Sequence, residues 1–266
     1  MFKKAVIGSL IAAMAITFSS CGTRVGENAV EKEKSIPAQN MRVQKTLEED
    51  LNGDGGKEKI IFYERKNEQG MPVAWTIMVD GYEMAALDGE EGIYTLADFK
   101  LQDVDGKDGP EVLFYRYNTG SAAALSLNIF KTAPKGWIEI FSVHNTFDMG
   151  RDRFEMRYLG DYQVSFKDKE TGLEHIIKLE KSRYTSTYAM LKDISTWVDP
   201  ISEYRIDDID GDRVNEITTV QRVIGIAHVD TIATLQTVYR LRNGVYKADR
   251  IKLTYDTGQL LAEKSL

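Results

Sequence analysis

The chain contains few of the residues that enzymes and cross-linked proteins most often use. Its 266 residues include one cysteine, three histidines and five prolines. A single cysteine excludes an intramolecular disulfide, so stability must come from a large core or from bound ions. The histidines, His144, His175 and His228, lack metal-ligand or triad spacing, and we interpret them as ordinary strand or surface residues.

Recognisable catalytic motifs are also missing. The sequence has no Gly-x-Ser-x-Gly, no phosphate-binding glycine loop and no His-Glu-x-x-His. It therefore predicts no catalytic residues and favours a protein that is not an enzyme. Glycosidase carboxylates come from distant strands and leave no local motif, so a hydrolase with an unrecognised carboxylate site stays an alternative. With 34 basic and 41 acidic residues the chain is acidic, which argues against nucleic acid as a ligand.

The N-terminal apolar run is too short for a membrane span. It covers Ala5 to Phe18, follows two lysines, and leads through Ser19 and Ser20 to Cys21. A spanning helix needs about 20 residues, so the pattern predicts a secretory signal. It resembles the bacterial lipoprotein signal, which implies a signal peptide over residues 1–20 and a lipid on Cys21. Phe18 departs from the usual aliphatic residue of that family, and an ordinary signal peptide or an uncleaved anchor are the alternatives.

Export would leave an acidic domain behind a polar segment. Removing Lys3 and Lys4 from the 34 basic residues leaves 32 against 41 acidic ones, a net charge of −9. Residues 21–46 are mostly polar without an apolar period, and they predict a lipidated cysteine followed by a flexible tether. A strand within the last residues of that range is the alternative. Residues 47–266, about 220 in number, are enough for one β-repeat domain on the extracytoplasmic face of a bacterial membrane.

Three similar acidic loops recur along this domain. The stretches "DLNGDGGKEKI", "DVDGKDGPEVL" and "DIDGDRVNEIT" begin at Asp50, Asp103 and Asp208. Each has Asp or Asn at position 3, Gly at position 4 and Glu at position 9, and each leads into an apolar, strand-like run. The starts are 53 and 105 residues apart, close to one and two multiples of one period. A period of about 50 residues made of strands is typical of propeller blades.

The segments between the loops predict strands and hairpins. Asp80-Gly81, Lys135-Gly136 and Asn243-Gly244 lie between apolar runs, as hairpin turns do. Alternation before the second and third loops predicts a fourth strand, so we expect units near 50–102, 103–150 and 203–266. The degenerate unit 151–202 has a Thr171-Gly172 hairpin and a segment of helical spacing. The predicted fold is all-β, a propeller-like or incomplete propeller of about four repeat units with a short helical insertion; an open, twisted assembly of sheets is the alternative.

The acidic loops have the composition of calcium sites. Calcium takes six to eight oxygen ligands, which positions 1, 3, 5, 7 and 9 of such a loop can supply. Lys107 at position 5 weakens the second loop, and Arg213 replaces a turn glycine in the third. The candidate ligands of the first loop are Asp50, Asn52, Asp54, the Gly56 carbonyl and Glu58. Those of the third are Asp208, Asp210, Asp212, the Val214 carbonyl and Glu216. The weaker candidates of the second are Asp103, Asp105, Asp108 and Glu111.

These loops differ from EF-hands and resemble another family. An EF-hand has a glutamate at position 12, where the first loop has Ile61, and its flanks are helices. The pattern resembles the FG-GAP/VCBS-type repeats of integrin α-subunit propellers, where an acidic loop opens a blade. The resemblance implies calcium-stabilised β structure at a cell surface, with no shared activity. The alternative is that Asp, Asn and Gly are present because they suit turns.

Aromatic residues are the remaining candidates for ligand contact. Trp75 and Trp137 lie in or at the start of predicted strands, where packing explains them. Trp197, beside Asp199-Pro200 in the atypical unit, is the better candidate for a surface contact. The sequence therefore favours a calcium-stabilised binding or scaffold module of the cell envelope. Its expected partners are the membrane, through Cys21, and an unknown envelope protein or polysaccharide. An envelope hydrolase and a purely structural surface lipoprotein are the alternatives.

Overall fold

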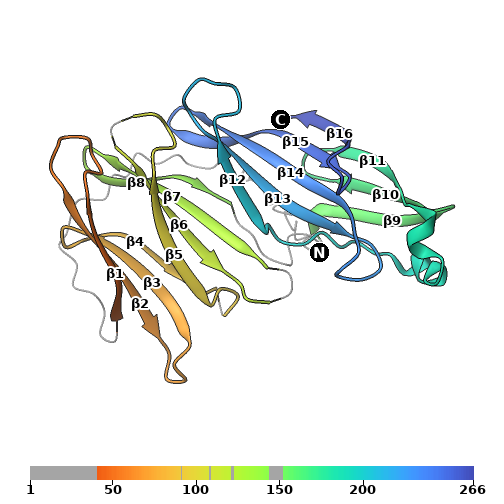
Figure 1. Ribbon diagram of the computed structural model, residues 1–266, viewed down its shortest axis with the longest axis horizontal. Coiled ribbons are helices and arrows are strands. Elements are labelled where there is room, and N and C mark those ends of the chain that lie inside the picture. The colour runs from red at the N-terminus through yellow and green to blue at the C-terminus, as the bar shows by residue number, and fades with distance from the viewer. Residues whose placement is uncertain (1–40, 91, 108, 121–122, 144–151) are drawn as a thin grey trace, which may run out of the picture.

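The structure, a computed structural model, describes residues 41–90, 92–107, 109–120, 123–143 and 152–266. The expected signal peptide (1–20), Cys21 and the first part of the tether lie outside these ranges, as do Asp108 and His144. The described chain forms sixteen β-strands and two short 3-10 helices (Figure 1). The prediction of an all-β fold is confirmed.

The strands form four antiparallel sheets, which we name A to D in chain order. Sheet A contains β1 (Met41–Glu49), β2 (Glu58–Lys66), β3 (Pro72–Val79) and β4 (Tyr82–Asp88). Sheet B contains β5 (Leu96–Gln102), β6 (Glu111–Tyr117), β7 (Leu125–Ala133) and β8 (Gly136–Ser142). Sheet C contains β9 (Phe154–Gly160), β10 (Gln163–Asp168) and β11 (Leu173–Lys178). Sheet D contains β12 (Glu203–Asp207), β13 (Glu216–Ile224), β14 (Thr231–Arg242), β15 (Val245–Thr254) and β16 (Leu260–Ser265). Each pair of neighbours follows the chain, so every sheet is a meander.

The expected hairpin turns join the expected strands. Asp80-Gly81 connects β3 to β4, and Asn243-Gly244 connects β14 to β15. All four residues have positive φ angles, between 51° and 83°, which is the geometry of a two-residue type I′ turn. The helical insertion is also confirmed: the 3-10 helices η1 (Lys181–Tyr184) and η2 (Tyr188–Asp193) follow sheet C.

The expected unit boundaries need correction. β5 pairs along its whole length with β6, so it opens sheet B and does not close a unit spanning 50–102. A short acidic loop joins the two strands, and a short loop between antiparallel strands brings them side by side as a hairpin. The sheets therefore cover residues 41–88, 96–142, 154–178 and 203–265, and each acidic loop lies inside a sheet's first hairpin.

The end of the expected tether also needs correction, because residues 41–46 belong to β1. This strand is the edge of sheet A and pairs with β2, with Leu47 opposite Ile60. Most of its side chains are exposed or half-buried. An edge strand needs no strong apolar alternation, because backbone hydrogen bonds to one neighbour hold it in place. The polar composition that predicted a tether therefore also fits this strand.

The order of the sheets in space differs from their order along the chain. Three cores of buried side chains join the sheets, one between A and B, one between B and D, and one between C and D. Figure 1 shows the resulting row, with sheet A at one end and sheet C at the other. Residues of sheet D near its acidic loop pack on sheet B, among them Ile217 and Tyr246. Its opposite end, including Val223 and Leu253, packs on sheet C.

Sheet B is covered on both faces, and its second strand explains why. Val112 and Phe114 of β6 face the core shared with sheet A, and Leu113 and Tyr115 face the core shared with sheet D. Alternate side chains of a strand point to opposite faces, so a strand between two cores is apolar throughout. The continuous apolar run after the second acidic loop is therefore the signature of a central sheet.

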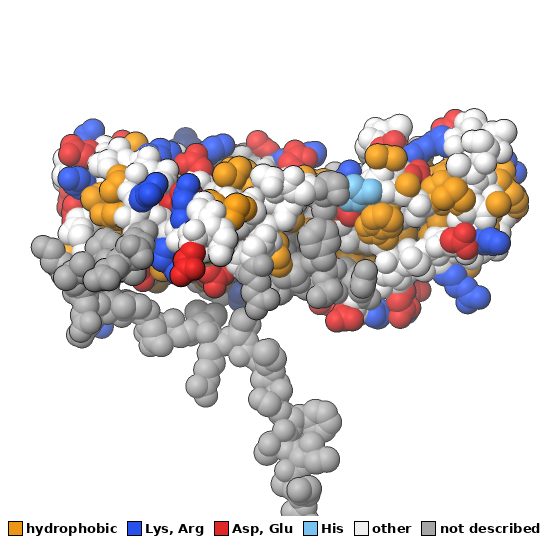
Figure 2. Space-filling model, turned by 90° about the horizontal axis from the view of Figure 1, so that it is seen from below, with side chains coloured by type: hydrophobic (Ala, Val, Ile, Leu, Met, Phe, Trp, Pro, Cys, Tyr) orange, Lys and Arg blue, Asp and Glu red, His pale blue; other side chains and the backbone are white. Residues whose placement is uncertain are grey.

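The surface mixes charges of both signs. Figure 2 shows acidic and basic side chains interspersed over one long face, with hydrophobic side chains exposed toward the end formed by sheets C and D. The exposed large hydrophobic residues of sheet C and its following segment are Leu159, Ile176, Tyr188, Met190 and Trp197. None of the helices within the described part of the chain combines the length and hydropathy needed to span a membrane.

Candidate functional site

The three acidic loops share one hydrogen-bonding scheme. The carboxylate at position 1 accepts the backbone N–H of the glycine at position 4, at 2.7 Å in each loop. These glycines have φ angles of 74°, 72° and 80°, a left-handed conformation that favours glycine. The sequence repeat therefore encodes one turn geometry three times.

The glutamate at position 9 closes each loop. Glu58, Glu111 and Glu216 each accept the backbone N–H of the residue at position 2, at 2.7 to 2.8 Å. Glu111 is 1% exposed and Glu216 is 4% exposed. Burial raises the pKa of Glu111 above its ordinary value, against the opposing effects of the Val104 N–H and of Lys131. The second carboxylate oxygen of each glutamate has further contacts, which differ among the loops.

The loops lie next to one another in a row. The Thr132 hydroxyl on β7 donates to the Leu51 carbonyl of the first loop, at 3.0 Å. Between the second and third loops, the Asn215 N–H donates to the Val104 carbonyl at 2.8 Å. The Tyr246 hydroxyl lies 3.1 Å from the Val104 oxygen and 2.9 Å from the Asn215 oxygen. Loops that are 105 residues apart in the sequence are thus neighbours along one side of the row of sheets.

The first loop is held by backbone groups and one amide. Asp50 accepts the N–H groups of Gly53, Asp54 and Gly55. The Asn52 amide donates to Glu58 Oε1 at 2.9 Å, and Asp54 accepts the Gly56 N–H. Within the described ranges, no ion pair involves a carboxylate of this loop. Its carboxylates therefore carry no basic counter-charge among the described residues, although backbone N–H groups and the Asn52 amide already bond their oxygens.

The second loop gathers three carboxylates around a lysine. One oxygen each of Asp103, Asp105 and Glu111 lie within 4.8 Å of one another. The Lys131 ammonium of β7 lies 2.6 Å from Asp105 Oδ2 and 3.4 Å from Glu111 Oε1. Burial lowers the pKa of Lys131, but its contacts with the two carboxylates outweigh burial and raise it. A lysine ammonium at this point supplies the positive charge that a metal ion would bring.

The third loop has the same arrangement with an arginine. One oxygen each of Asp208, Asp210 and Glu216 lie within 4.8 Å of one another. Arg240 of β14 lies 2.7 Å from Asp210 Oδ2 and 3.5 Å from Glu216 Oε1. Asp212, a predicted ligand, is outside this group and accepts the N–H of Val214. Arg213 has a φ angle of 75°, so it does take the conformation that glycine would adopt more readily.

Lys131 and Arg240 occupy equivalent places in sheets B and D. Two residues after Glu111, Leu113 pairs with Ile129, and Lys131 lies two residues further along that strand. Two residues after Glu216, Thr218 pairs with Val238, and Arg240 lies two residues further along that strand. The equivalent place in sheet A is Gly81, because Ile60 pairs with Val79. That glycine belongs to the hairpin turn and has no side chain.

The sequence pattern predicts the carboxylates of the loops but does not predict Lys131 and Arg240 as their partners. Their roles depend on strand register, which the repeat pattern did not include. The signal that could have found them is a basic residue four or five positions before the hairpin glycine, at Lys131 before Gly136 and Arg240 before Gly244. The first loop has no basic contact among the described residues, which favours a cation there, although only the second and third loops bring three carboxylate oxygens within 4.8 Å of one another.

The tryptophans differ in burial. Trp75 is 1% exposed and lies in the core between sheets A and B, as expected. Trp197 is 37% exposed; its ring stacks on His228 with centroids 5.7 Å apart. Its indole N–H donates to Asp199 Oδ1 at 3.0 Å, and the buried Asp199 also binds Arg222 at 2.6 Å. Trp197 is thus anchored at one edge and open to solvent at the other.

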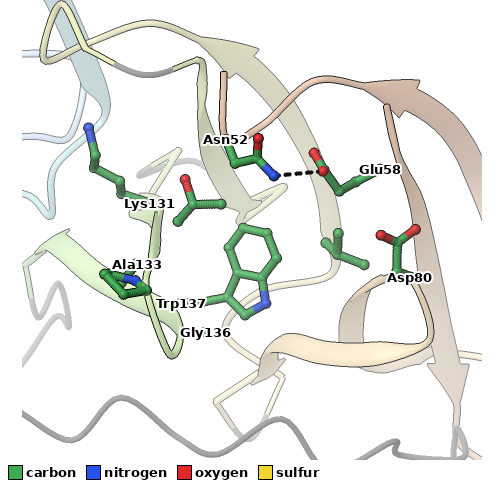
Figure 3. Close-up of a pocket in the computed structure, with 10 residues that line it drawn as sticks. Asn52, Glu58, Asp80, Lys131, Ala133, Gly136 and Trp137 are labelled. Carbon is green, nitrogen blue, oxygen red and sulfur yellow. Dashed lines mark hydrogen bonds between the residues drawn. The ribbon is translucent and has the colours of Figure 1, made fainter. Parts of the chain in front are cut away.

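A pocket of about 420 Å³ opens beside the first loop, between sheets A and B. Figure 3 shows Trp137 of β8 in its middle, with Glu58 and Asp80 on one side and Lys131 on the other. Trp137 is half-buried and also packs against the core between sheets A and B, so packing explains only part of its position. This pocket was not foreseen, because its walls come from segments more than 50 residues apart in the sequence.

Comparisons with known proteins bear on the second half of the chain. Residues 152–254 match the family described as the YybI C-terminal domain. This region covers sheet C and β12 to β15 of sheet D, and it includes the third acidic loop but neither of the other two. Searches of curated proteins and of solved structures give no match.

Proposed function

We propose that this protein is a lipid-anchored, calcium-stabilised binding or scaffold module on the extracytoplasmic face of a bacterial membrane. The row of three acidic loops with one shared hydrogen-bonding scheme carries the proposal. Stacked sheets that contact mainly their neighbours expose loops at their ends, which suits recognition. The lipid on Cys21 and the signal peptide over residues 1–20 belong to the proposal, as does contact with an envelope protein or polysaccharide.

We further propose that sheets A, B and D form three blades of an incomplete propeller. Their acidic loops stand side by side along one side of the row, as blade-opening loops do in the family that the sequence resembles. Sheet C lacks such a loop and packs at the far end of sheet D, where it would end the row. The segment that follows sheet C exposes Trp197, Tyr188 and Met190, which offer apolar surface to a partner.

Calcium would act as a structural brace, first of all in loop 1. Asp50, Asn52, Asp54, Glu58 and the Gly56 carbonyl would hold it. In loops 2 and 3, the basic side chains of Lys131 and Arg240 already balance the carboxylates. Calcium would have to displace Arg240 to bind the third loop, so we expect that site to be weaker.

Thermal melting in calcium and in chelator tests the brace. For residues 21–266 carrying Cys21→Ser, calcium should raise the melting temperature and chelator should lower it, because an ion that binds only the folded state stabilises it. Asp54→Asn keeps an acceptor for the Gly56 N–H but removes charge, and it should shrink the calcium effect most. Asp212→Ala should shrink it less, and Asp256→Asn, on the β15–β16 turn, serves as the control. A melting temperature that changes with neither calcium nor chelator would contradict the proposal that calcium stabilises the fold.

Binding itself needs a separate experiment. Cross-linking on intact cells, followed by identification of the captured molecule, should yield the same partner from the native chain in repeated experiments. Trp197→Ala should reduce the yield if the apolar surface formed by Tyr188, Met190 and Trp197 makes the contact. If Trp197→Ala captures as much partner as the native chain, the contact lies elsewhere on the protein.

A further inference from the structure

The pocket between sheets A and B has an aromatic wall with a polar edge. The Trp137 indole lies in the middle of the pocket (Figure 3), flanked by Thr132, Pro134 and Gly136 of the β7–β8 hairpin. Its indole nitrogen is buried without a hydrogen-bond partner among the described residues. Tryptophan presents the most negative ring face of the aromatic side chains, so it is the best partner for a cation.

Two carboxylates of the same pocket lack a basic partner. Glu58 binds only the Leu51 N–H and the Asn52 amide, and Asp80 binds the Lys59 N–H, within the part of the chain that is described. No ion pair of the described residues includes either carboxylate. Both come from sheet A and line the pocket opposite the β7–β8 hairpin. Their charges therefore act on whatever enters.

The one basic residue in the wall does not cancel these charges. Lys131 is held by Asp105 and Glu111 of the second loop, at 2.6 and 3.4 Å. Its ammonium is turned away from the indole (Figure 3). Because two carboxylates outside the pocket already surround it, the electrostatic balance inside the pocket is set by Glu58 and Asp80.

We propose that this pocket binds a primary alkylammonium group, from a lysine side chain of a partner protein or from a free polyamine. The ammonium would lie between the Trp137 ring and the carboxylates of Glu58 and Asp80. A neutral sugar could stack on the indole and donate hydroxyl hydrogen bonds to the carboxylates, but it brings no charge to balance Glu58 and Asp80. Calcium would gain nothing from an indole. The inference deepens the proposed binding role by naming the ligand chemistry. Because Glu58 is also a proposed calcium ligand of the first loop, bound calcium would compete with the ammonium group for that carboxylate.

The indole N–H signals in an NMR titration test the proposal directly. The chain has three tryptophans, so three signals can be assigned by single Trp→Phe substitutions in residues 21–266 with Cys21→Ser. Nα-acetyl-lysine methylamide should shift the Trp137 signal with millimolar affinity, and the norleucine analogue, which lacks the ammonium, should not. Spermidine provides the polyamine arm: tighter binding than the lysine compound assigns the site to polyamines, and weaker or equal binding assigns it to protein lysines.

The chain itself suggests a well-matched pair of variants. Asp80→Asn turns the Asp80-Gly81 hairpin into the Asn-Gly turn that sheet D already uses at Asn243-Gly244, with φ angles of 51° and 55° at the two first positions. It should fold and should weaken binding about threefold, as expected for one partly exposed charge. Asn243→Asp is the reciprocal control and should leave binding unchanged. Trp137→Leu should weaken binding about tenfold.

Each result of the titration either supports or overturns the proposed ammonium site. Equal shifts with lysine and norleucine compounds, or undiminished binding in Asp80→Asn, would overturn the proposal. A Trp137 shift with chitotriose but not with the ammonium compounds would make the pocket a sugar site instead. Running the titration in chelator keeps Glu58 free of calcium. A Trp137 response under that condition, in a protein whose melting temperature does not change with calcium, would contradict the calcium brace and leave the ammonium site standing.

Discussion

The Lys131 ammonium on β7 lies 2.6 Å from Asp105 Oδ2 in the second acidic loop. The two side chains are 17% and 7% exposed, so the pair is largely removed from water. Glu111, 1% exposed, is the third member at 3.4 Å. The lysine thus fixes the loop to the middle of sheet B, where a free cation could do the same.

Lys131→Met should destabilise the protein by about 3 kcal/mol, because it leaves two buried carboxylates without a counter-charge. Urea unfolding of residues 21–266 with Cys21→Ser would measure the change. Calcium should restore more stability to this variant than to the parent chain, since the vacated position favours a cation. Lys107→Met, an exposed lysine in the same loop, is the control and should change stability by less than about 0.5 kcal/mol. A variant as stable as the parent would refute the role of Lys131.

The buried ion pair of Asp168 and Arg153 should make the stability of the protein fall at low pH. Asp168 is fully buried, and Arg153 binds both of its oxygens at 2.9 and 2.6 Å. Burial raises the pKa of Asp168, but Arg153, Thr171 and the Glu170 N–H outweigh it and hold the pKa below its ordinary value. Its stabilising contribution is therefore full above the unfolded pKa, about 4, and is lost as pH falls through the lower folded pKa.

Unfolding free energies measured from pH 7 down to pH 2 would check this dependence. Asp168→Asn should cost about 3 kcal/mol at pH 7, because Arg153 loses its buried partner, and the cost should shrink toward pH 2. Glu155→Gln, which removes an exposed carboxylate of the neighbouring strand β9, is the control. A cost for Asp168→Asn that is the same at both ends of the pH range would contradict the assignment.

Tyr246 joins the second and third loops across sheets B and D. Its hydroxyl contacts the carbonyl oxygens of Val104 and Asn215, and burial raises its pKa well above the ordinary value. Tyr246→Phe should cost about 1.5 kcal/mol, because it removes the one hydroxyl proton that these two carbonyl oxygens share. Tyr255→Phe, whose hydroxyl bonds the Lys178 carbonyl at a more exposed place, should cost less. Equal costs in thermal or urea unfolding would show that the bridge between the loops adds nothing.

Local features of the fold were accessible from the amino-acid pattern. The Asp80-Gly81 and Asn243-Gly244 turns form where the sequence predicts them, because two-residue hairpins need residues that accept positive φ. The Thr171-Gly172 hairpin and the short helical insertion were likewise predicted. The boundaries of the units were not, since β5 alternates equally well whether it pairs with the strand before it or the strand after it.

In the candidate site, too, the sequence pattern predicts some residues and leaves others out. The carboxylates of Asp103, Asp105 and Glu111, and those of Asp208, Asp210 and Glu216, were predicted and do come together. The expectation that the second loop would be the poorest cluster rested on Lys107, which lies outside the group of three. Lys131 and Arg240 escaped notice because they lie on other strands and reach the loops only through register.

The sequence by itself determined the all-β class, the hairpins and the threefold repetition of the acidic loop. These depend on contacts within a few residues, where turn chemistry and strand periodicity act. Only the tertiary structure decided that sheet C stands at the end of the row, that the loops are neighbours, and that a pocket opens at Trp137. These features depend on contacts such as that of Tyr246 with Val104, which are 142 residues apart in the chain. Such contacts follow from which apolar faces pack together, and a one-dimensional pattern of apolar residues leaves that choice open.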